Sequence, residues 1–210
     1  MKKRRKLKKK FVVLMVLIFI LIVLVTGLIL YVKFHKKPDV VIEAKVVNEI
    51  KEYGYVLENN KTELYKDLFD KLVDVLKEEK VDEEEYAKII SQMAVIDFYN
   101  LDNKTSKNDI GGTQFIREEN VSNFVLQASE TVYKYVEQNL DGNRQQVLPV
   151  VKAVEATNIK TGKYSYKGVK DDKAYTVTVK LEYKKDLGYP KEVVVKLLHN
   201  DKKLEIYYMK

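Results

Sequence analysis

The sequence has no cysteine and no tryptophan, and it contains three prolines and two histidines among 210 residues. Without cysteine there is no disulfide, no thiolate nucleophile, no cysteine metal site and no acylation site of the lipoprotein type. The histidines, His35 and His199, lie in no sequence pattern typical of a catalytic or metal site. We therefore predict a protein that is not an enzyme, has no cofactor and no metal, and is stabilised by packing.

What the sequence does have is one long uncharged run, residues 11–32, directly after the basic segment KKRRKLKKK at residues 2–10. About 20 apolar residues in a helix are enough to cross the roughly 30 Å hydrocarbon core of a bilayer. A secretory signal has a shorter apolar region and a small-residue cleavage site, whereas the first alanine here is Ala44. A buried helix of a soluble protein is typically polar on one face. The run therefore predicts an uncleaved transmembrane helix at residues 11–32.

The charges that flank this run predict its orientation. Residues 2–10 carry eight lysines and arginines, against three in residues 33–39, which form a short juxtamembrane linker that contains Pro38. Because the positive flank of a span stays in the cytoplasm, the basic tail at residues 1–10 is expected inside and the C-terminus outside. The expected location is the cell membrane, in a single pass, with the lipid bilayer as one partner.

The net charge of the chain comes from its N-terminus. The first 37 residues hold eleven positive and no negative charges, so the +7 of the whole chain becomes −4 for residues 38–210. The predicted outer domain, residues 40–210, is mildly acidic, and we expect no nucleic acid as a partner. The 34 lysines against four arginines suggest an AT-rich, Gram-positive type of bacterial source.

The periodicity of the outer domain changes from helical to extended after Pro149. Before it, apolar spacing and capping residues predict helices at about 61–79, from the Asp82 cap to Tyr99, and at 118–140, with a short helix and a turn in residues 40–56. After it, alternation predicts strands near 150–158, 163–169, 174–184, 191–199 and 204–209. Helices followed by an antiparallel meander of four to five strands define an α+β class.

One carboxylate of the second predicted helix stands out, because Asp97 lies on its apolar side, four residues after Met93. A buried acid needs a partner, and Arg117, after a Gly-Gly pair, is one of two arginines in the outer domain. Asp97, Arg117 and Tyr99 are therefore our candidates for a buried pair or pocket. Two interpretations stay open: a hydrogen-bonded acid that stabilises the fold, and a wall of a ligand pocket.

Helices followed by a long-stranded antiparallel meander resemble the nuclear-transport-factor-two-like superfamily, which is cone-shaped and α+β. A short basic tail, one span and one such outer domain are also similar to the assembly-factor family of bacterial conjugation and type IV secretion channels. This resemblance implies a non-enzymatic, membrane-anchored domain that binds other envelope proteins or a second copy of itself. The alternative is a small-ligand or peptide binder, or less plausibly an enzyme, that uses the pocket of the cone.

Overall fold

The computed structural model describes residues 9–35, 44–166 and 168–210 of the chain. The chain divides into two compact units, Met1–Val40 and Val41–Lys210. The predicted tail up to residue 8, the part of the linker from residue 36, and the first residues of the outer domain up to 43 lie outside the described residues.

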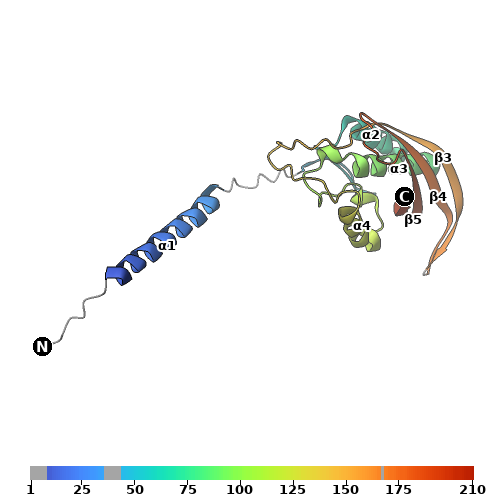
Figure 1. Cartoon of the computed structure of the whole chain (residues 1–210). Coiled ribbons are helices and arrows are strands. Elements are labelled where there is room, and N and C mark those ends of the chain that lie inside the picture. The colour runs from blue at the N-terminus through green and yellow to red at the C-terminus, as the bar shows by residue number, and fades with distance from the viewer. Residues whose placement is uncertain (1–8, 36–43, 167) are drawn as a thin grey trace. The chain divides into compact units, whose positions relative to one another are not determined.

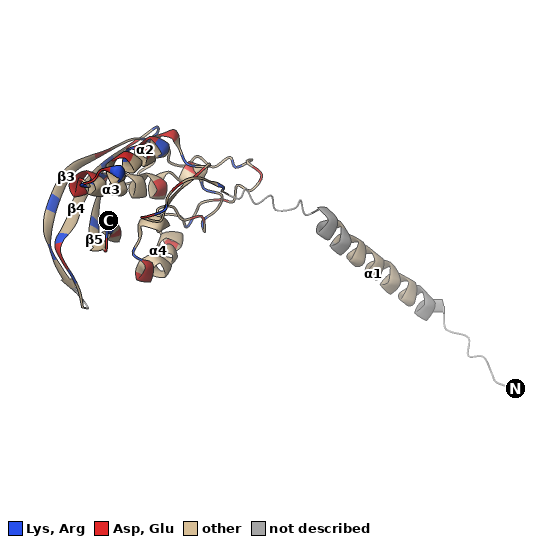
Figure 2. Ribbon diagram, turned by 180° about the vertical axis from the view of Figure 1, so that it is seen from behind, with Lys and Arg blue, Asp and Glu red and all other residues tan. Residues whose placement is uncertain are grey.

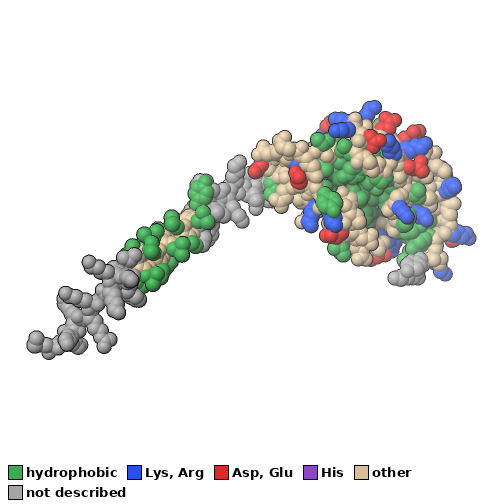
Figure 3. Space-filling model, viewed as in Figure 1, with side chains coloured by type: hydrophobic (Ala, Val, Ile, Leu, Met, Phe, Trp, Pro, Cys, Tyr) green, Lys and Arg blue, Asp and Glu red, His purple; other side chains and the backbone are tan. Residues whose placement is uncertain are grey.

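The first unit contains one helix, α1 (Lys9–His35), which includes the uncharged run. Its described large apolar side chains, from Leu14 to Tyr31, are between 45% and 67% exposed. Figure 3 shows apolar side chains along the visible face of the helix, and the sequence of its described centre, residues 14–28, contains no charged residue. Counting the described residues alone, no helix has the length and apolar character that crossing a membrane requires.

The second unit is built on a four-stranded antiparallel sheet in the order β3-β4-β5-β6. Each strand pairs with the next one along the chain, so the sheet is a meander (Figure 1). In β4 the side chains of Val177 and Val179 are buried while those of Lys180 and Glu182 are exposed, as the alternation predicts. The strands are β3 (Val151–Tyr166), β4 (Val169–Tyr183), β5 (Glu192–Asn200) and β6 (Lys203–Met209).

The α+β class is confirmed, and so is the antiparallel meander, but two of the predicted strands are one. Residues 151–158 and 163–166 of the two predicted strands belong to the single strand β3, because bulges near residues 152, 157 and 163 absorb the irregular pattern without ending the pairing. Residues 170–173, which separate two of the predicted strands, lie inside β4.

Residues 46–58 form a β-hairpin, so the short helix predicted within residues 40–56 is wrong where the structure describes it. The strands β1 (Val46–Ile50) and β2 (Tyr55–Glu58) pair in antiparallel fashion. The turn is placed at Gly54, which has a φ of 68°. Tyr55 and Leu57 are buried in alternation, so the packing of β2 outweighs the helical spacing of the preceding valines.

Two helices follow and pack on each other, α2 (Glu63–Lys77) and α3 (Glu83–Tyr99). Thr62 caps α2 by accepting the Tyr65 N–H, and Asp82 caps α3 by accepting the N–H groups of Glu84 and Glu85. Both helices start within about two residues of where the sequence predicts. Helix α3 lies against one face of the sheet, where it contacts three strands (Figure 1).

The helix α4 (Glu118–Glu130) is ten residues shorter than predicted. It ends where Tyr133 turns inward, with its main-chain N–H donating to the Ala128 carbonyl. The Tyr133 ring is fully buried, and its hydroxyl donates to the Phe98 carbonyl at 2.7 Å. This tertiary contact outweighs the helical periodicity that continues to residue 140. Two short 3-10 helices, η1 (Leu101–Asn103) and η2 (Thr113–Phe115), complete the loop between α3 and α4.

The core lies between α3 and the curved sheet. From Ile89 to Tyr99 nearly every side chain of α3 is buried, because the sheet, α2 and the loop after α3 cover it on several sides. The facing side chains of β4 and β5, Val177, Val179, Val193 and Val195, are each 0% exposed. The space enclosed by the sheet is thus filled by side chains.

Two buried tyrosines, Tyr86 of α3 and Tyr55 of β2, join these elements to the edge strand β6. The Tyr86 hydroxyl accepts the Leu204 N–H at 3.0 Å and lies 2.6 Å from the Tyr55 hydroxyl. Tyr55 in turn donates to the Leu204 carbonyl at 3.0 Å. Both main-chain groups of Leu204 are therefore satisfied by side chains from α3 and β2.

Replacing Tyr86 by Phe leaves the Leu204 N–H unsatisfied in the core and is expected to lower the free energy of unfolding by about 1–3 kcal/mol. Chemical denaturation followed by circular dichroism measures the change. The matched control is Tyr135→Phe, because Tyr135 is 76% exposed and its loss of a hydroxyl should change stability by less than about 0.5 kcal/mol. Equal effects of the two substitutions would contradict the role of this hydrogen bond.

Candidate functional site

The carboxylate of Asp97 is the centre of the most deeply buried charged cluster that the structure describes. Asp97 is 5% exposed, near the C-terminal end of α3, as its place on the apolar side of the helix predicts. The Nζ of Lys61 lies 3.0 Å from both carboxylate oxygens, and the Nζ of Lys104 lies 2.8 Å from Oδ1. The main-chain N–H of Gly112 donates to Oδ2 at 2.8 Å. One side chain therefore joins the start of α2 and two points of the loop after α3 to the end of this helix.

Each lysine of this cluster comes from a different part of the fold. Lys61 lies between β2 and α2, and its Nζ also contacts Glu58 Oε2 at 3.1 Å. Lys104 follows η1 and is 3% exposed, which a lysine tolerates because Asp97 neutralises it. The cluster thus holds the start of α2 and the loop after α3 in place.

The cluster shifts the acid–base equilibria of its members. Burial alone would raise the pKa of Asp97, but the charges of Lys104 and Lys61 and the Gly112 hydrogen bond lower the pKa to about 2. Burial alone would lower the pKa of Lys61, but the Asp97 and Glu58 carboxylates raise it. Asp97 is therefore ionised at neutral pH, and it is an acceptor rather than a general acid.

The Gly-Gly pair is required by close approach to this cluster. A Cβ on Gly111 would lie 1.9 Å from the main-chain oxygen of Asp97, and Gly112 has a φ of 79°. The Gly111 N–H donates to the Tyr133 hydroxyl at 3.1 Å. The two glycines therefore let the loop lie directly on the end of α3.

Arg117 and Tyr99, the other two predicted site residues, are not in contact with the Asp97 carboxylate. The Arg117 side chain pairs with Glu119, so the pair expected between Asp97 and Arg117 is replaced by pairs of each residue with a different partner. Tyr99 is 6% exposed and packs edge-on against Phe98, with ring centroids 4.9 Å apart. Its place is in the hydrophobic core, where burial raises its pKa.

Sequence reasoning missed Lys61 and Lys104 for a simple reason. Lysine is the commonest charged residue of the chain, and neither lysine has a distinctive local pattern. Arginine is the expected partner of a buried carboxylate such as Asp97 because of its bidentate geometry. The choice between 34 lysines depends on which loops fold onto Asp97, and this is a tertiary property.

A hollow of about 380 Å³ borders the cluster, lined also by Thr113, Gln114 and Asp109. Its polar groups are largely used within the protein. Gln114 exchanges two hydrogen bonds with the main chain of Val56 and donates to the Tyr65 hydroxyl at 2.8 Å. The geometry therefore favours the structural interpretation of Asp97 over the ligand-pocket interpretation.

The structure also assembles a second polar cluster, around His199 at the end of β5. Its main-chain N–H and Nδ1 lie 2.8 and 2.9 Å from Asp171 Oδ2, and its Nε2 lies 3.8 Å from Glu83 Oε1. Tyr175 donates its hydroxyl to Glu83 Oε2 at 3.1 Å. Burial alone would raise the pKa of Asp171, but the hydrogen bonds from His199 and Lys173 lower it.

This second cluster was missed because Glu83, Asp171 and His199 are far apart in the sequence. Among the described residues, no serine or threonine hydroxyl bonds to His199. No group of three or more metal-ligating side chains occurs in the part of the chain that the structure describes. The contacts join the start of α3 to two strands, which is a structural role.

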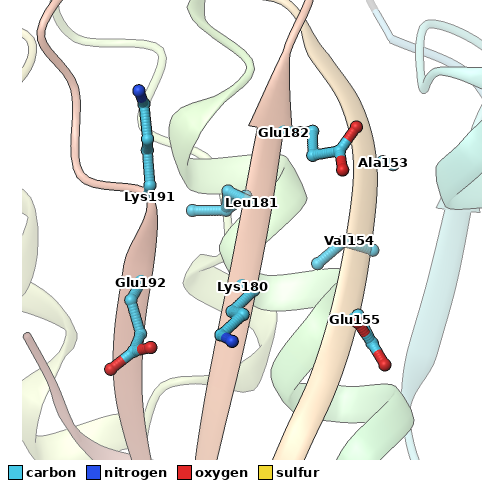
Figure 4. A pocket seen from close by; sticks show the side chains of 8 residues that line it. All are labelled: Ala153, Val154, Glu155, Lys180, Leu181, Glu182, Lys191 and Glu192. Atoms are coloured by element: carbon cyan, nitrogen blue, oxygen red, sulfur yellow. The ribbon is translucent and has the colours of Figure 1, made fainter.

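A second hollow, of about 380 Å³, lies over the strands β3, β4 and β5 (Figure 4). Glu155, Lys180 and Glu192 lie opposite one another on the three neighbouring strands. Rows of alternating charge across strands stabilise the solvent face of a sheet. The hollow therefore has the character of a solvated surface.

No protein-family model, no curated protein and no solved structure matches the chain.

The depressed pKa of Asp97 predicts a specific dependence of stability on pH. Because the folded pKa of Asp97, about 2, is below that of an aspartate in the unfolded chain, roughly 3.9, the ionised carboxylate stabilises the fold above about pH 4 and this contribution is lost as the pH falls to 2. Asp97→Asn should unfold more easily at pH 7, by at least about 2 kcal/mol, and the difference from the wild type should shrink between pH 4 and 2. Denaturant titrations at each pH measure it. The control is Asp67→Asn on α2, and a difference for Asp97→Asn that does not change with pH would contradict the assignment.

Proposed function

We propose that the chain is a single-pass membrane protein of the bacterial cell envelope, whose extracytoplasmic domain is not an enzyme and binds other envelope proteins. The observation that carries this proposal is the 22-residue uncharged run, residues 11–32, on a helix whose described side chains are exposed on all sides. The fold that follows it has a filled interior and polar clusters whose groups are satisfied internally.

The exposure of α1 supports an apolar environment for this helix. Burying one large aliphatic or aromatic side chain is worth about 1.5–3 kcal/mol, and the described part of α1 exposes more than ten of them. Within the first unit there is no second helix or strand among the described residues to cover them. A bilayer supplies such cover along the whole length of residues 11–32.

The distribution of charge supports a topology with the basic tail in the cytoplasm and the folded domain outside. The described centre of α1 carries no charged residue, and the second unit mixes both signs over its helices and strands (Figure 2). A mixed, mildly acidic surface offers no single-sign patch for nucleic acid. The lipid bilayer, envelope proteins and a second copy of the chain are the partners that we propose.

The architecture of the second unit supports protein interaction over ligand binding. A cone-shaped fold binds a small ligand in the space enclosed by its sheet, and here α3 fills that space with Ile89, Ile90 and Met93, each at most 1% exposed. What the domain offers to a partner is therefore its surface. We also propose that these helices and the curved four-stranded meander that follows them form a nuclear-transport-factor-two-like fold, similar to the assembly factors of conjugation and type IV secretion channels.

The anchor predicts how the protein distributes on cell fractionation. The full chain should stay with the membrane after an alkaline carbonate wash and be released by detergent, whereas a chain that lacks residues 2–37 should be in the soluble fraction. Leu21→Lys with Val25→Lys should weaken insertion, since a lysine at the centre of a span costs about 2.5–3.5 kcal/mol. Immunoblots of the fractions measure this. Release of the full chain by carbonate would contradict the anchor.

The absence of cysteine makes the orientation directly testable with single-cysteine variants. A membrane-impermeant maleimide added to intact cells should label Lys185→Cys, which is in the outer domain, and should label Lys6→Cys only after the membrane is made permeable. The wild type is the blank. Labelling of Lys6→Cys alone in intact cells would show the reverse topology.

A further inference from the structure

The strand β6 is an edge of the sheet, and other segments of the domain cover part of this edge. Leu204, Ile206 and Met209 of β6 have main-chain groups directed away from β5, and a bulge at Tyr207 separates Ile206 from the end of the strand. At Leu204 the tyrosine pair described above satisfies both groups. At Ile206 the carbonyl accepts the Arg117 N–H at 3.0 Å, beside a parallel bridge between Ile116 and Ile206. These contacts prevent other strands from pairing with this part of the edge.

The third such residue is Met209, where the edge is open. Lys210 exchanges two main-chain hydrogen bonds with Val194, so by the alternation of an antiparallel ladder the N–H and C=O of Met209, opposite Val195, point away from β5. No described residue donates to or accepts from these two groups. The segment that pairs at Ile206 leaves the edge at Arg117 to begin α4, and none of the described strands pairs with the next position along the edge.

A groove of about 400 Å³ lies at this open position, between β6 and α4. We call it the α4–β6 groove. Figure 3 shows hydrophobic side chains gathered on the face of the domain that carries α4 and the sheet. One wall is a single stripe of α4 at helical spacing, and the other is the end of β6. The residues that line the groove include Asn120, Asn123, Phe124, Gln127, Tyr208 and Met209.

The chemistry of this groove matches a polypeptide main chain. The side-chain amides of Asn120, Asn123 and Gln127 each donate and accept hydrogen bonds, as a peptide group does. Together with the free N–H and C=O of Met209 they provide partners on both sides of an extended strand. Phe124 supplies an apolar surface for alternate side chains of such a strand.

We propose that the α4–β6 groove binds an extended segment of a partner protein, which adds to the sheet as a strand beside Met209. The bound segment continues the line of the Ile116–Arg117 segment along the same edge. The proposal rests on the proposed function and specifies the kind of partner: a protein with an exposed, extended segment on the same side of the membrane.

A second copy of this chain is a poorer occupant than a partner segment. The other edge of the sheet is β3, which has three bulges and carries exposed lysines such as Lys152, Lys160 and Lys163. Bulges and lysines are the features with which edge strands avoid pairing with one another. β6 has one such irregularity, between Ile206 and Tyr208, and Met209 lies beyond it. The two edges of the sheet therefore differ: β3, with three bulges and exposed lysines, resists strand addition more than the end of β6 does.

The decisive variant is Met209→Pro, which removes the outward N–H and leaves the ladder between β5 and β6 intact, since proline is tolerated on a strand edge where its N–H would face solvent. Its matched control is Met209→Ala, which keeps the N–H and removes the side chain. A second pair is Gln127→Ala in the groove and Ser122→Ala on the exposed side of α4. Denaturant unfolding of each purified variant verifies that it is folded.

The experiment uses the full chain in its membrane, with a photo-crosslinking amino acid at Asn123 in the groove or at Lys71 on the exposed side of α2. We expect a crosslink from position 123 to one contiguous segment of another protein, identified by mass spectrometry. Its yield should fall roughly fivefold in Met209→Pro and less strongly in Gln127→Ala, and stay unchanged in Met209→Ala and Ser122→Ala.

The other outcomes overturn the proposal in distinguishable ways. A crosslink from position 123 that is insensitive to Met209→Pro rejects strand addition, and a crosslink to a second copy of the chain replaces it by self-association. Crosslinks from position 71 alone reject the groove but leave the interaction function in place. An absence of protein crosslinks from both positions rejects the groove and removes the main support of the interaction function as well.

Discussion

A carboxylate that is ionised inside the protein sets the arrangement of the elements around it. Asp97 is buried at the end of α3, and an ionised acid is stable there only if opposite charges and hydrogen-bond donors surround it. Lys61, Lys104 and Gly112 meet this requirement from the β2–α2 junction and from the loop after α3. The contact also requires glycine at position 111, because a side chain there would collide with the end of α3.

The rest of the fold is arranged about α3, which Asp97 fixes at one end. At the other end the Glu83 carboxylate accepts a hydrogen bond from the Tyr175 hydroxyl and lies near His199. Both ends of this helix therefore have polar contacts to other elements. Between them the apolar side chains of α3 fill the curve of the sheet. A helix enclosed in this way leaves little room for a ligand within the sheet, and the recognition that we propose is therefore at the surface, in the α4–β6 groove.

The candidate site shows which of its features the residue pattern predicts and which it does not. The apolar spacing around Asp97 predicted its burial, and the cost of an unpaired buried charge predicted that it has a partner. The identity of the partner was not predictable, since Arg117 and the two lysines are all remote from Asp97 in the chain and the fold alone decides which of them reaches it. The same applies to Glu83, Asp171 and His199, which no local pattern connects.

Residues close together in the chain account for the uncharged run at residues 11–32, the α+β class, the cap of α3 and the alternation of β4. Tertiary structure decided that β3 is one bulged strand, that α4 stops where Tyr133 turns into the core, and that residues 46–58 form a hairpin rather than a helix. In each of these cases local preference is weak, worth a few tenths of a kcal/mol to about 1 kcal/mol per residue, and burial against a distant segment outweighs it.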